Sequence, residues 1–336
     1  MGLRLLIVTD AWFPQVNGVV RTLSTMVAEL RSRGDVVETI TPADFRSVPC
    51  PTYPEIRLAI CSPQAIARRI AAFRPTAVHI ATEGPLGFLA RRYVLKRGWP
   101  FSTSFHTRFP EYIHTRTRFP IRWSYAALRW FHGPAASVMV PTPAVQHDLQ
   151  ARGFQNLKLW TRGVDTALFH PGPRPDWSRD LARPVMLYVG RIAVEKSLPD
   201  FLALDRPGTK LVVGDGPARA DLERRFPEAR FPGAKFGPEL ADAYRAADVF
   251  VFPSRTDTFG LVLLEALATG TPVAAYPVMG PVDVIGSAPV GCLDRNLDRA
   301  ITEALTVHRD RCRAYAKQFS WAACADRFRS FLAPFG

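Results

Sequence analysis

Two carboxylates, Asp257 and Glu265, bracket the apolar part of SRTDTFGLVLLEALATG (residues 254–270). The segment follows a strand-like stretch, VFVFPS, and its spacing predicts a helix that begins near Gly260. The first amides of a helix lack partners within it, and the helix dipole favours an anion at that end. Carboxylates are good acceptors for pairs of hydroxyl groups. The pattern fits an extended ligand with phosphates in the middle and sugars at both ends, such as a sugar nucleotide.

Two cations follow another predicted strand, in the stretch YVGRIAVEK. Arg191 and Lys196 can both reach a diphosphate, the arginine as a fork and the lysine as a point charge. A diphosphate leaving group needs such charges, because negative charge builds on it as its bond breaks. Simpler interpretations stay open: Asp257 or Thr258 caps the helix, Glu265 lies in solvent, and the two cations are ordinary surface residues.

Three weaker signals lie at other predicted strand ends or helix starts. Gly18, in PQVNGVVRTL, comes directly before a helix, so its backbone can approach a phosphate. His106, in SFHTRFPEY, ends a strand and can hydrogen-bond a sugar hydroxyl. Gly214 belongs to a glycine-rich turn, VGDGP, after a strand. Each of these signals is weak alone.

The elements that must position these residues follow a repeated order of strand, loop, helix and glycine. Short apolar runs such as LRLLIVTD and PVMLYVGRI are typical of buried parallel strands, and helical spacing follows them. The order restarts after a proline-rich break, FHPGPRPDW (residues 169–177). The 336 residues suit two domains. We therefore predict an α/β fold with two Rossmann-like, doubly wound domains and a ligand cleft between them.

Taken in order along the chain, NGVVRTL, VGRIAVEK, VGDGP and ADVFVFPSRTDTFGLVLLEALATG resemble the family-four retaining glycosyltransferases of the GT-B fold. That family contains mannosyl-, glucosyl- and sulfoquinovosyltransferases that build bacterial glycolipids. The resemblance covers nearly the whole chain. It implies an acceptor-side domain over residues 1–170, a sugar-nucleotide-binding domain over 171–312, and a C-terminal helix over 313–336 that packs back on the first domain.

The resemblance also implies a role for individual residues. Arg191 and Lys196 match the pair that neutralises the donor diphosphate, and Glu265 matches the acid that holds the ribose diol. Asp257 stands where the family has a glutamate that holds donor-sugar hydroxyls, so the family's E-x7-E is D-x7-E here. His106 resembles the histidine near the donor sugar. The backbone contacts to sugar, phosphate and base are implied for Gly18, Gly214, Phe236, Gly237, Thr258, Phe259, Gly260, Leu261 and Val262.

The implied reaction moves a hexosyl group from UDP- or GDP-hexose to a hydroxyl with retention, through a transition state like an oxocarbenium ion. The resemblance suggests same-face attack, with the leaving phosphate taking the acceptor's proton. The chain has no D-x-D, so we expect no metal ion and no cofactor; the two cations would take the metal's place. Neither the base, the hexose nor the oligomeric state follows from the sequence.

The charge of the chain suggests where it works. The net charge is +13, and residues 66–132 hold twelve Lys or Arg against two acids. This stretch is also rich in aromatic residues, and residues 115–132 are our best candidate for contact with an anionic membrane. An arginine-rich soluble surface explains the charge equally well.

No signal peptide, membrane span or cysteine pairing is apparent, so we expect a cytoplasmic enzyme, peripheral on the inner face of the membrane. The acceptor would be a lipid such as diacylglycerol or a glycosyl-diacylglycerol, and no nucleic-acid partner is expected. Two alternatives stay open: a transferase acting on a soluble or polysaccharide acceptor, and a basic protein that binds nucleic acid or membrane without catalysis.

Overall fold

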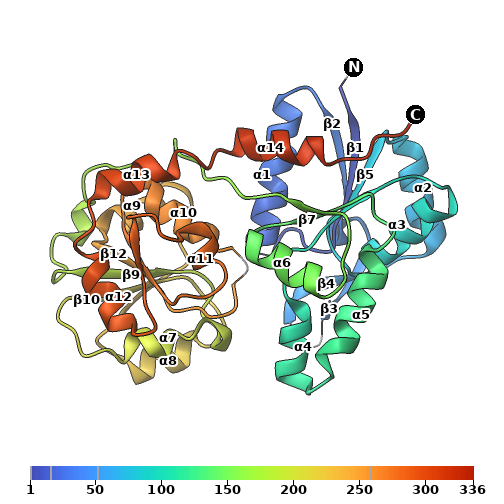
Figure 1. Ribbon diagram of the computed structural model, residues 1–336. Coiled ribbons are helices and arrows are strands. Elements are labelled where there is room, and N and C mark those ends of the chain that lie inside the picture. The colour runs from blue at the N-terminus through green and yellow to red at the C-terminus, as the bar shows by residue number, and fades with distance from the viewer. Residues whose placement is uncertain (1, 16, 51–52, 258) are drawn as a thin grey trace. The chain divides into compact units, whose positions relative to one another are not determined.

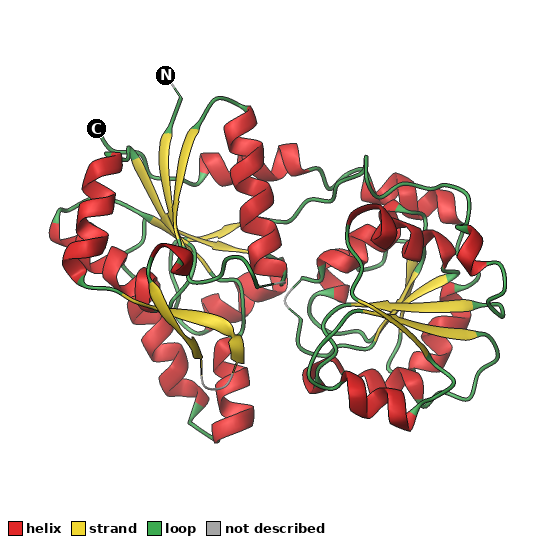
Figure 2. Ribbon diagram, turned by 180° about the vertical axis from the view of Figure 1, so that it is seen from behind, coloured by secondary structure: helices red, strands yellow, loops and turns green. Residues whose placement is uncertain are grey.

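The computed structural model describes residues 2–15, 17–50, 53–257 and 259–336. The chain forms two compact units, one from Met1–Thr161 with Trp321–Gly336 and one from Arg162–Ser320. Each unit is a parallel sheet with helices on both faces (Figures 1 and 2). The predicted α/β class, with two doubly wound halves, is confirmed.

The sheet of the first unit has six parallel strands in the order β2-β1-β5-β6-β7-β8. Successive side chains of a strand point to opposite faces, so Leu6 and Val8 pack on one side of the sheet and Leu5 and Ile7 on the other. A separate antiparallel pair joins β3 to β4. The strands are β1 (Arg4–Val8), β2 (Val36–Ile40), β3 (Arg46–Cys50), β4 (Tyr53–Ile60), β5 (Ala77–Ile80), β6 (Ser102–Ser104), β7 (Ser137–Val140) and β8 (Leu157–Leu159).

Helices cover both faces of this sheet. Side chains of α2, α3 and α5 pack on one face, and those of α1 and α14 pack on the other. Helix α4 packs against α5. The helices are α1 (Gly18–Ser32), α2 (Pro63–Phe73), α3 (Pro85–Lys96), α4 (Phe109–Thr117), α5 (Ile121–His132), α6 (Pro143–Ala151) and α14 (Trp321–Ser330).

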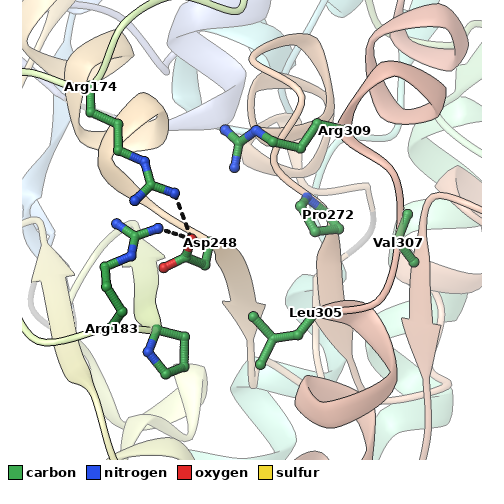
Figure 3. A pocket seen from close by; sticks show the side chains of 8 residues that line it. Arg174, Arg183, Asp248, Pro272, Leu305, Val307 and Arg309 are labelled. Carbon is green, nitrogen blue, oxygen red and sulfur yellow. Dashed lines mark hydrogen bonds and ion pairs between the residues drawn. The ribbon is translucent and has the colours of Figure 1, made fainter.

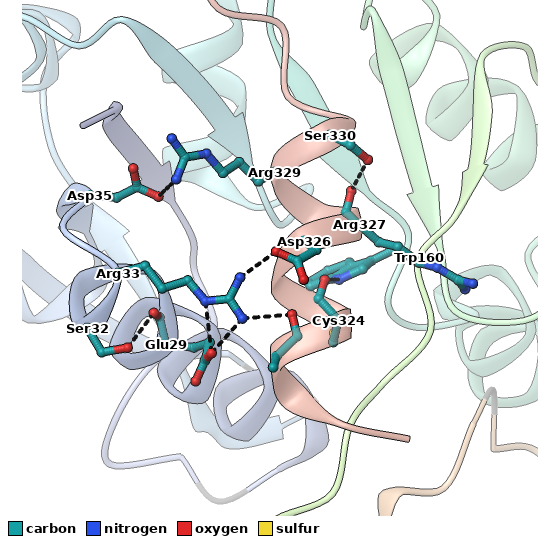
Figure 4. Close-up of polar contacts among 11 residues, drawn as sticks. Glu29, Ser32, Arg33, Asp35, Trp160, Cys324, Asp326, Arg327, Arg329 and Ser330 are labelled. Atoms are coloured by element: carbon teal, nitrogen blue, oxygen red, sulfur yellow. Dashed lines mark hydrogen bonds and ion pairs between the residues drawn. The ribbon is translucent and has the colours of Figure 1, made fainter. Parts of the chain in front are cut away.

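The end of the chain is anchored in the first unit through α14 (Figure 4). Trp160 is fully buried, and its indole N–H donates to the carbonyl of Cys324 at 3.2 Å. The guanidinium of Arg33 at the end of α1 lies 2.5 Å from a carboxylate oxygen of Asp326. Arg329 reaches Asp35 at 3.0 Å. Apolar burial and peripheral ion pairs therefore hold α14 in place.

The second unit repeats the plan with the strand order β11-β10-β9-β12-β13-β14, all parallel. The chain builds one half of the sheet from β9 outward to β11, then returns to the other side of β9. The strands are β9 (Val185–Val189), β10 (Thr209–Val213), β11 (Arg230–Gly233), β12 (Val249–Phe252), β13 (Val273–Ala275) and β14 (Gly291–Leu293).

Two apolar clusters flank this second sheet. One contains side chains of α9, α10, α11 and α13, and the other contains side chains of α7, α8 and α12. The helices are α7 (Leu198–Leu202), α8 (Arg219–Arg225), α9 (Gly237–Ala246), α10 (Leu261–Ala268), α11 (Pro281–Val284), α12 (Leu297–Ala304) and α13 (Arg309–Ala316). The strand β12 and the helix α10 are the elements that the sequence predicted around the two carboxylates.

The predicted C-terminal helix over 313–336 differs from what the structure has. The segment holds the last residues of α13, in the second unit, and the whole of α14, which packs on the first unit as expected; the chain changes units between Ser320 and Trp321. The division at Thr161 and Arg162 also lies nine residues before the predicted boundary at 170–171. No helix among the described residues has the length and apolar character that crossing a bilayer requires.

Candidate active site

The strand order of the second unit places the predicted donor residues at one point. Strands β9 and β12 are neighbours, although β10 and β11 lie between them in sequence. Ligands of open α/β sheets bind beyond the carboxyl ends of the strands, where the strand order reverses. The loop after β9 carries Arg191 and Lys196, and the loop after β12 carries Asp257 and Gly260. The structure therefore brings these four residues to the reversal point of the sheet.

A side-chain hydrogen bond and a close backbone contact hold the loop that carries Arg191. The hydroxyl of Tyr188 donates to the carbonyl of Arg191 at 2.8 Å. Burial, followed by the charges of Asp257 and Glu195, raises the pKa of Tyr188 well above its usual value, so the hydroxyl stays a donor. A Cβ on Gly214 would lie 1.9 Å from the carbonyl oxygen of Gly190. Gly214, which the resemblance placed near the donor, therefore also has a packing reason to be glycine.

An ion pair joins the two loops. The Lys196 ammonium lies 2.6 Å from Oδ1 of Asp257, and both side chains are about one-fifth exposed, at 19% and 21%. Lys196 ends a short 3-10 turn (Val194–Lys196), and the hydroxyl of Thr256 donates to the carbonyl of Glu195 at 3.4 Å. The contact holds a cation and a carboxylate side by side at the ends of β9 and β12.

Two buried oxygens in the loop after β12 lack hydrogen-bond partners among the described residues. They are Oδ2 of Asp257 and Oγ of Ser254, and both atoms are buried. Buried polar atoms in folded proteins are normally paired, so an unpaired acceptor next to a loop indicates a ligand or ordered water. Oδ2 of Asp257 is therefore free to accept from a hydroxyl while Oδ1 holds Lys196.

The backbone at Gly280 closely contacts the loop before α10. Gly280 has φ +90°, and a Cβ there would lie 2.9 Å from the carbonyl oxygen of Asp257 and 3.3 Å from that of Phe259. Any larger residue at this position would push on the segment that carries Asp257. Gly280 was not predicted from the sequence, because one glycine in a loop carries no signal of what it touches.

The start of α10 has the geometry that the sequence predicted. Gly260 caps the helix with φ +84°, a conformation that favours glycine. Phe259 is buried, and Leu261 and Val262 are half-buried. Thr258 lies outside the described residues.

Glu265 is buried inside the second unit. It is 3% exposed, and its Oε2 accepts a hydrogen bond from the hydroxyl of Tyr244 on α9 at 2.9 Å. It therefore does not lie on a solvated helix face, which was the simpler interpretation of the sequence. Its proposed contact with the ribose stays a prediction. Tyr244 was missed because it lies 21 residues away on another helix.

Phe236 and Gly237 follow β11, at the same edge of the sheet. Phe236 is 59% exposed and stands before α9, where it offers a free aromatic face. Gly237 has φ +51° and no atom within 4 Å of where a Cβ would lie. The positive φ, and not a close contact with other residues, therefore explains why this position is glycine.

Gly18 and His106 belong to the first unit. Gly18 begins α1, but Oδ1 of Asn17 accepts from the amides of Val19 and Val20, both at 3.0 Å, so part of this helix start already has a cap. His106 follows β6 and its ring lies edge-on to Trp160 at 6.0 Å between centroids.

A buried carboxylate, Asp10, marks the strand-order reversal of the first sheet, between β1 and β5. Its Oδ1 accepts from the amide of Leu86 at 3.0 Å, at the start of α3. Burial raises the pKa of Asp10, and hydrogen bonds from Leu86, Thr82 and Gly87 oppose that shift. Asp10 was not predicted from the sequence either.

Comparison with known proteins identifies the family. The model of Glycosyltransferase Family 4 matches residues 16–168, and that of Glycosyl transferases group 1 matches residues 183–308. A GDP-mannose-dependent alpha-mannosyltransferase of Mycobacterium tuberculosis is 31% identical over 97% of this chain and 95% of its own length. The chain belongs to the family 4 glycosyltransferases. The resemblance seen in the sequence is thus confirmed, and the chain is an enzyme that transfers a glycosyl group.

Two further relatives of this glycosyltransferase also match most of its length. A sulfoquinovosyl transferase of Arabidopsis thaliana is 31% identical over 97% of this chain and 72% of its own length. An alpha-monoglucosyldiacylglycerol synthase of Streptococcus pneumoniae is 27% identical over 92% of this chain and 79% of its own length. These names describe the relatives.

Solved structures confirm the GT-B fold. The sucrose-phosphate synthase of Thermosynechococcus elongatus matches with a TM-score of 0.77 and 19% identity over 97% of both chains. HepE of Anabaena, solved in complex with UDP-glucose, matches with a TM-score of 0.73 and 15% identity over 97% of this chain and 98% of its own. At these identities the likeness concerns the fold alone.

Proposed function

We propose that this glycosyltransferase moves a hexosyl group from UDP- or GDP-hexose to the hydroxyl of a membrane lipid, with retention of the anomeric configuration. The observation that carries the donor half is the meeting of Arg191, Lys196, Asp257 and the start of α10 where the strand order reverses between β9 and β12. An arginine, a lysine and a helix start together provide positive charge for a diphosphate.

The two carboxylate oxygens of Asp257 have different roles in the proposed site. Oδ1 of Asp257 holds the ammonium at 2.6 Å, and the buried Oδ2 lacks a partner among the described residues. We assign Oδ2 to a donor-sugar hydroxyl and the ammonium to the diphosphate. The carboxylate then positions the lysine before the donor arrives, and preorganised charge is the main source of electrostatic catalysis.

In the proposed reaction the bond between the anomeric carbon and the diphosphate oxygen breaks while a bond to the acceptor oxygen forms on the same face. The leaving phosphate takes the acceptor's proton. The negative charge that develops on the diphosphate meets Arg191, Lys196 and the amides at the start of α10. Because these groups supply the positive charge, we propose that transfer continues in EDTA, without a divalent cation.

The proposal of a lipid acceptor is supported by the relative named alpha-monoglucosyldiacylglycerol synthase and by the surface of α4, α5 and the turn between them. Four large apolar side chains there are 42–59% exposed: Ile113, Phe119, Trp123 and Trp130. Arginines lie among them, and the guanidinium of Arg122 is 5.7 Å from the ring of Trp123. Basic and aromatic residues together suit the interface of an anionic bilayer.

One experiment tests both halves. The purified enzyme is incubated with a panel of UDP- and GDP-hexoses and extracted membrane lipid, and the products are identified by mass. We expect a lipid heavier by one hexosyl unit with at least one donor. Donor hydrolysis without a lipid product would retain the donor half and contradict the lipid acceptor, and no consumption of any donor would contradict the proposal as a whole.

A further inference from the structure

A pocket of about 390 Å³ opens at the opposite edge of the sheet in the second unit (Figure 3). It lies where strands begin: β9 starts directly after Pro184, β12 after Asp248, and β13 after Pro272. Since the strands are parallel, this edge is the one away from the candidate donor site. The lining residues are Arg174, Arg183, Pro184, Asp248, Pro272, Leu305, Val307 and Arg309.

Three guanidinium groups and one carboxylate face this pocket. Arg174 lies 2.7 Å from Oδ1 of Asp248, and Arg183 pairs with the same oxygen. Figure 3 shows these two arginines on one side of the pocket and Arg309 on the other. The second carboxylate oxygen accepts from the amide of Val185 at 2.7 Å, so Asp248 is already occupied by the protein.

The negative charge around the pocket does not balance the three arginines. Besides Asp248, the guanidinium groups meet the end of α9, where Arg183 donates to the carbonyl of Ala246 at 3.0 Å and Arg309 to that of Ala247 at 2.9 Å. A helix end supplies about half an elementary charge. Three positive charges therefore face about one and a half negative ones.

Burial and mutual repulsion both disfavour the charged forms of two of these arginines. Burial, and then the charges of Arg174 and Arg309, lower the pKa of Arg183 to about 10. Burial, and then Arg174, also lower the pKa of Arg309. The arginines are thus held together at some electrostatic cost, which an anion between them would relieve.

Many donors of these arginines remain available to a ligand. Each guanidinium has five N–H donors. The described residues accept two from Arg183, two from Arg309 and one from Arg174. The fork geometry of arginine matches phosphate oxygens bidentately.

We propose that this pocket binds the phosphate group of a small phosphorylated molecule, separately from the donor site. Arg174, Arg183 and Arg309 take the phosphate. Pro272, Leu305 and Val307 offer an apolar wall to the rest of the molecule. The volume is in the range of small-molecule sites and exceeds what a lone phosphate fills.

The test measures phosphate binding by titration calorimetry at constant ionic strength, in the full chain. The probes are inorganic phosphate and phenyl phosphate, a monoester with an apolar group. Arg191→Ala/Lys196→Ala serves as the background, because it removes the cations of the candidate donor site. We expect saturable binding of both probes in this background, with phenyl phosphate the tighter.

Variants at Arg174 then locate the binding. This side chain is 46% exposed, so its replacement leaves the core intact. Arg174→Gln should weaken phosphate binding roughly tenfold or more, and Arg174→Glu should abolish it. The matched control is Arg224→Gln, an exposed arginine paired with Asp221, which should change nothing. Absence of saturable binding in the background, or equal affinity in the Arg174 variants, would overturn the site. Equal affinity for both probes would contradict the proposed role of Pro272, Leu305 and Val307 as an apolar wall for the ligand.

Discussion

At the scale of single residues, the account depends on the ion pair between Lys196 and Asp257. Asp257→Asn keeps the size of the side chain but removes the charge that holds the ammonium at 2.6 Å. A hydrogen bond to a charged group contributes about 1.5–3 kcal/mol. We expect kcat/KM for the donor to fall roughly tenfold to a hundredfold, measured by steady-state kinetics with the productive donor.

The control for this variant is Asp221→Asn, another carboxylate of the second unit, which pairs with the exposed Arg224 and Arg225. It should leave kcat/KM unchanged. If Asp257→Asn also left the rate unchanged while the protein stayed folded, the carboxylate would have no part in donor binding or in positioning Lys196.

Gly280→Ala tests the backbone that supports Asp257. The new Cβ would press on the carbonyl oxygens of Asp257 and Phe259, and the φ of +90° would add backbone strain. Gly34→Ala is a matched control, because Gly34 has φ +86° and no atom within 4 Å of its Cβ position. Thermal unfolding should show destabilisation in both variants, larger in Gly280→Ala because only there does the new Cβ also meet backbone oxygens, and transfer should slow only in Gly280→Ala. Equal rates would show that the loop before α10 tolerates displacement.

At the scale of elements, α14 is required by the first unit. Phe328 is fully buried among side chains of α1 and the sheet, and its ring lies 4.9 Å from that of Trp160. Phe328→Ala should lower the free energy of unfolding of the first unit by about 3–5 kcal/mol, measured by urea denaturation. The exposed neighbour Arg327 gives the control Arg327→Ala, which should change it by less than about 0.5 kcal/mol. A small effect of Phe328→Ala would mean that α14 is not part of this core.

Much of this element plan could be predicted from the sequence, because buried parallel strands and amphipathic helices leave clear patterns. β1, α1, β9, β12 and α10 all lie where apolar runs and helical spacing predicted them. The sequence analysis did not identify the pair β3 and β4, or the break between α13 and α14. The first has no uniform apolar run, and the second falls inside one continuous amphipathic pattern.

The candidate site could be predicted where residues lie in the loop after a strand or at the start of the next helix. Arg191, Lys196 and Asp257 lie in such loops, and Gly260 lies at such a helix start. The adjacency of β9 and β12, the contact of Tyr244 with Glu265, and the pocket around Asp248 all depend on strand order and on helix packing. Such contacts join residues far apart in sequence, and no local pattern encodes them.

At the scale of the whole molecule, the net charge of +13 and the exposed aromatic residues of α4 and α5 predict attachment to anionic membranes. Liposomes with anionic lipid should pellet the protein, and neutral liposomes should pellet much less of it. Trp123→Ala should weaken pelleting several-fold, because the ring is 59% exposed. Trp177→Ala is the matched control, since Trp177 is 52% exposed and lies in the second unit. No pelleting with either lipid would contradict the membrane proposal.

The most direct test of the central claim removes the two cations that are proposed to hold the diphosphate. The variant is Arg191→Ala/Lys196→Ala, and the measured quantity is kcat/KM for the productive sugar nucleotide. The control is Arg224→Ala/Arg225→Ala, which removes two exposed charges of the same unit. We predict a fall of at least about 10²-fold in the first variant and no change in the second. A kcat/KM equal to that of the unmodified enzyme in Arg191→Ala/Lys196→Ala would contradict the account.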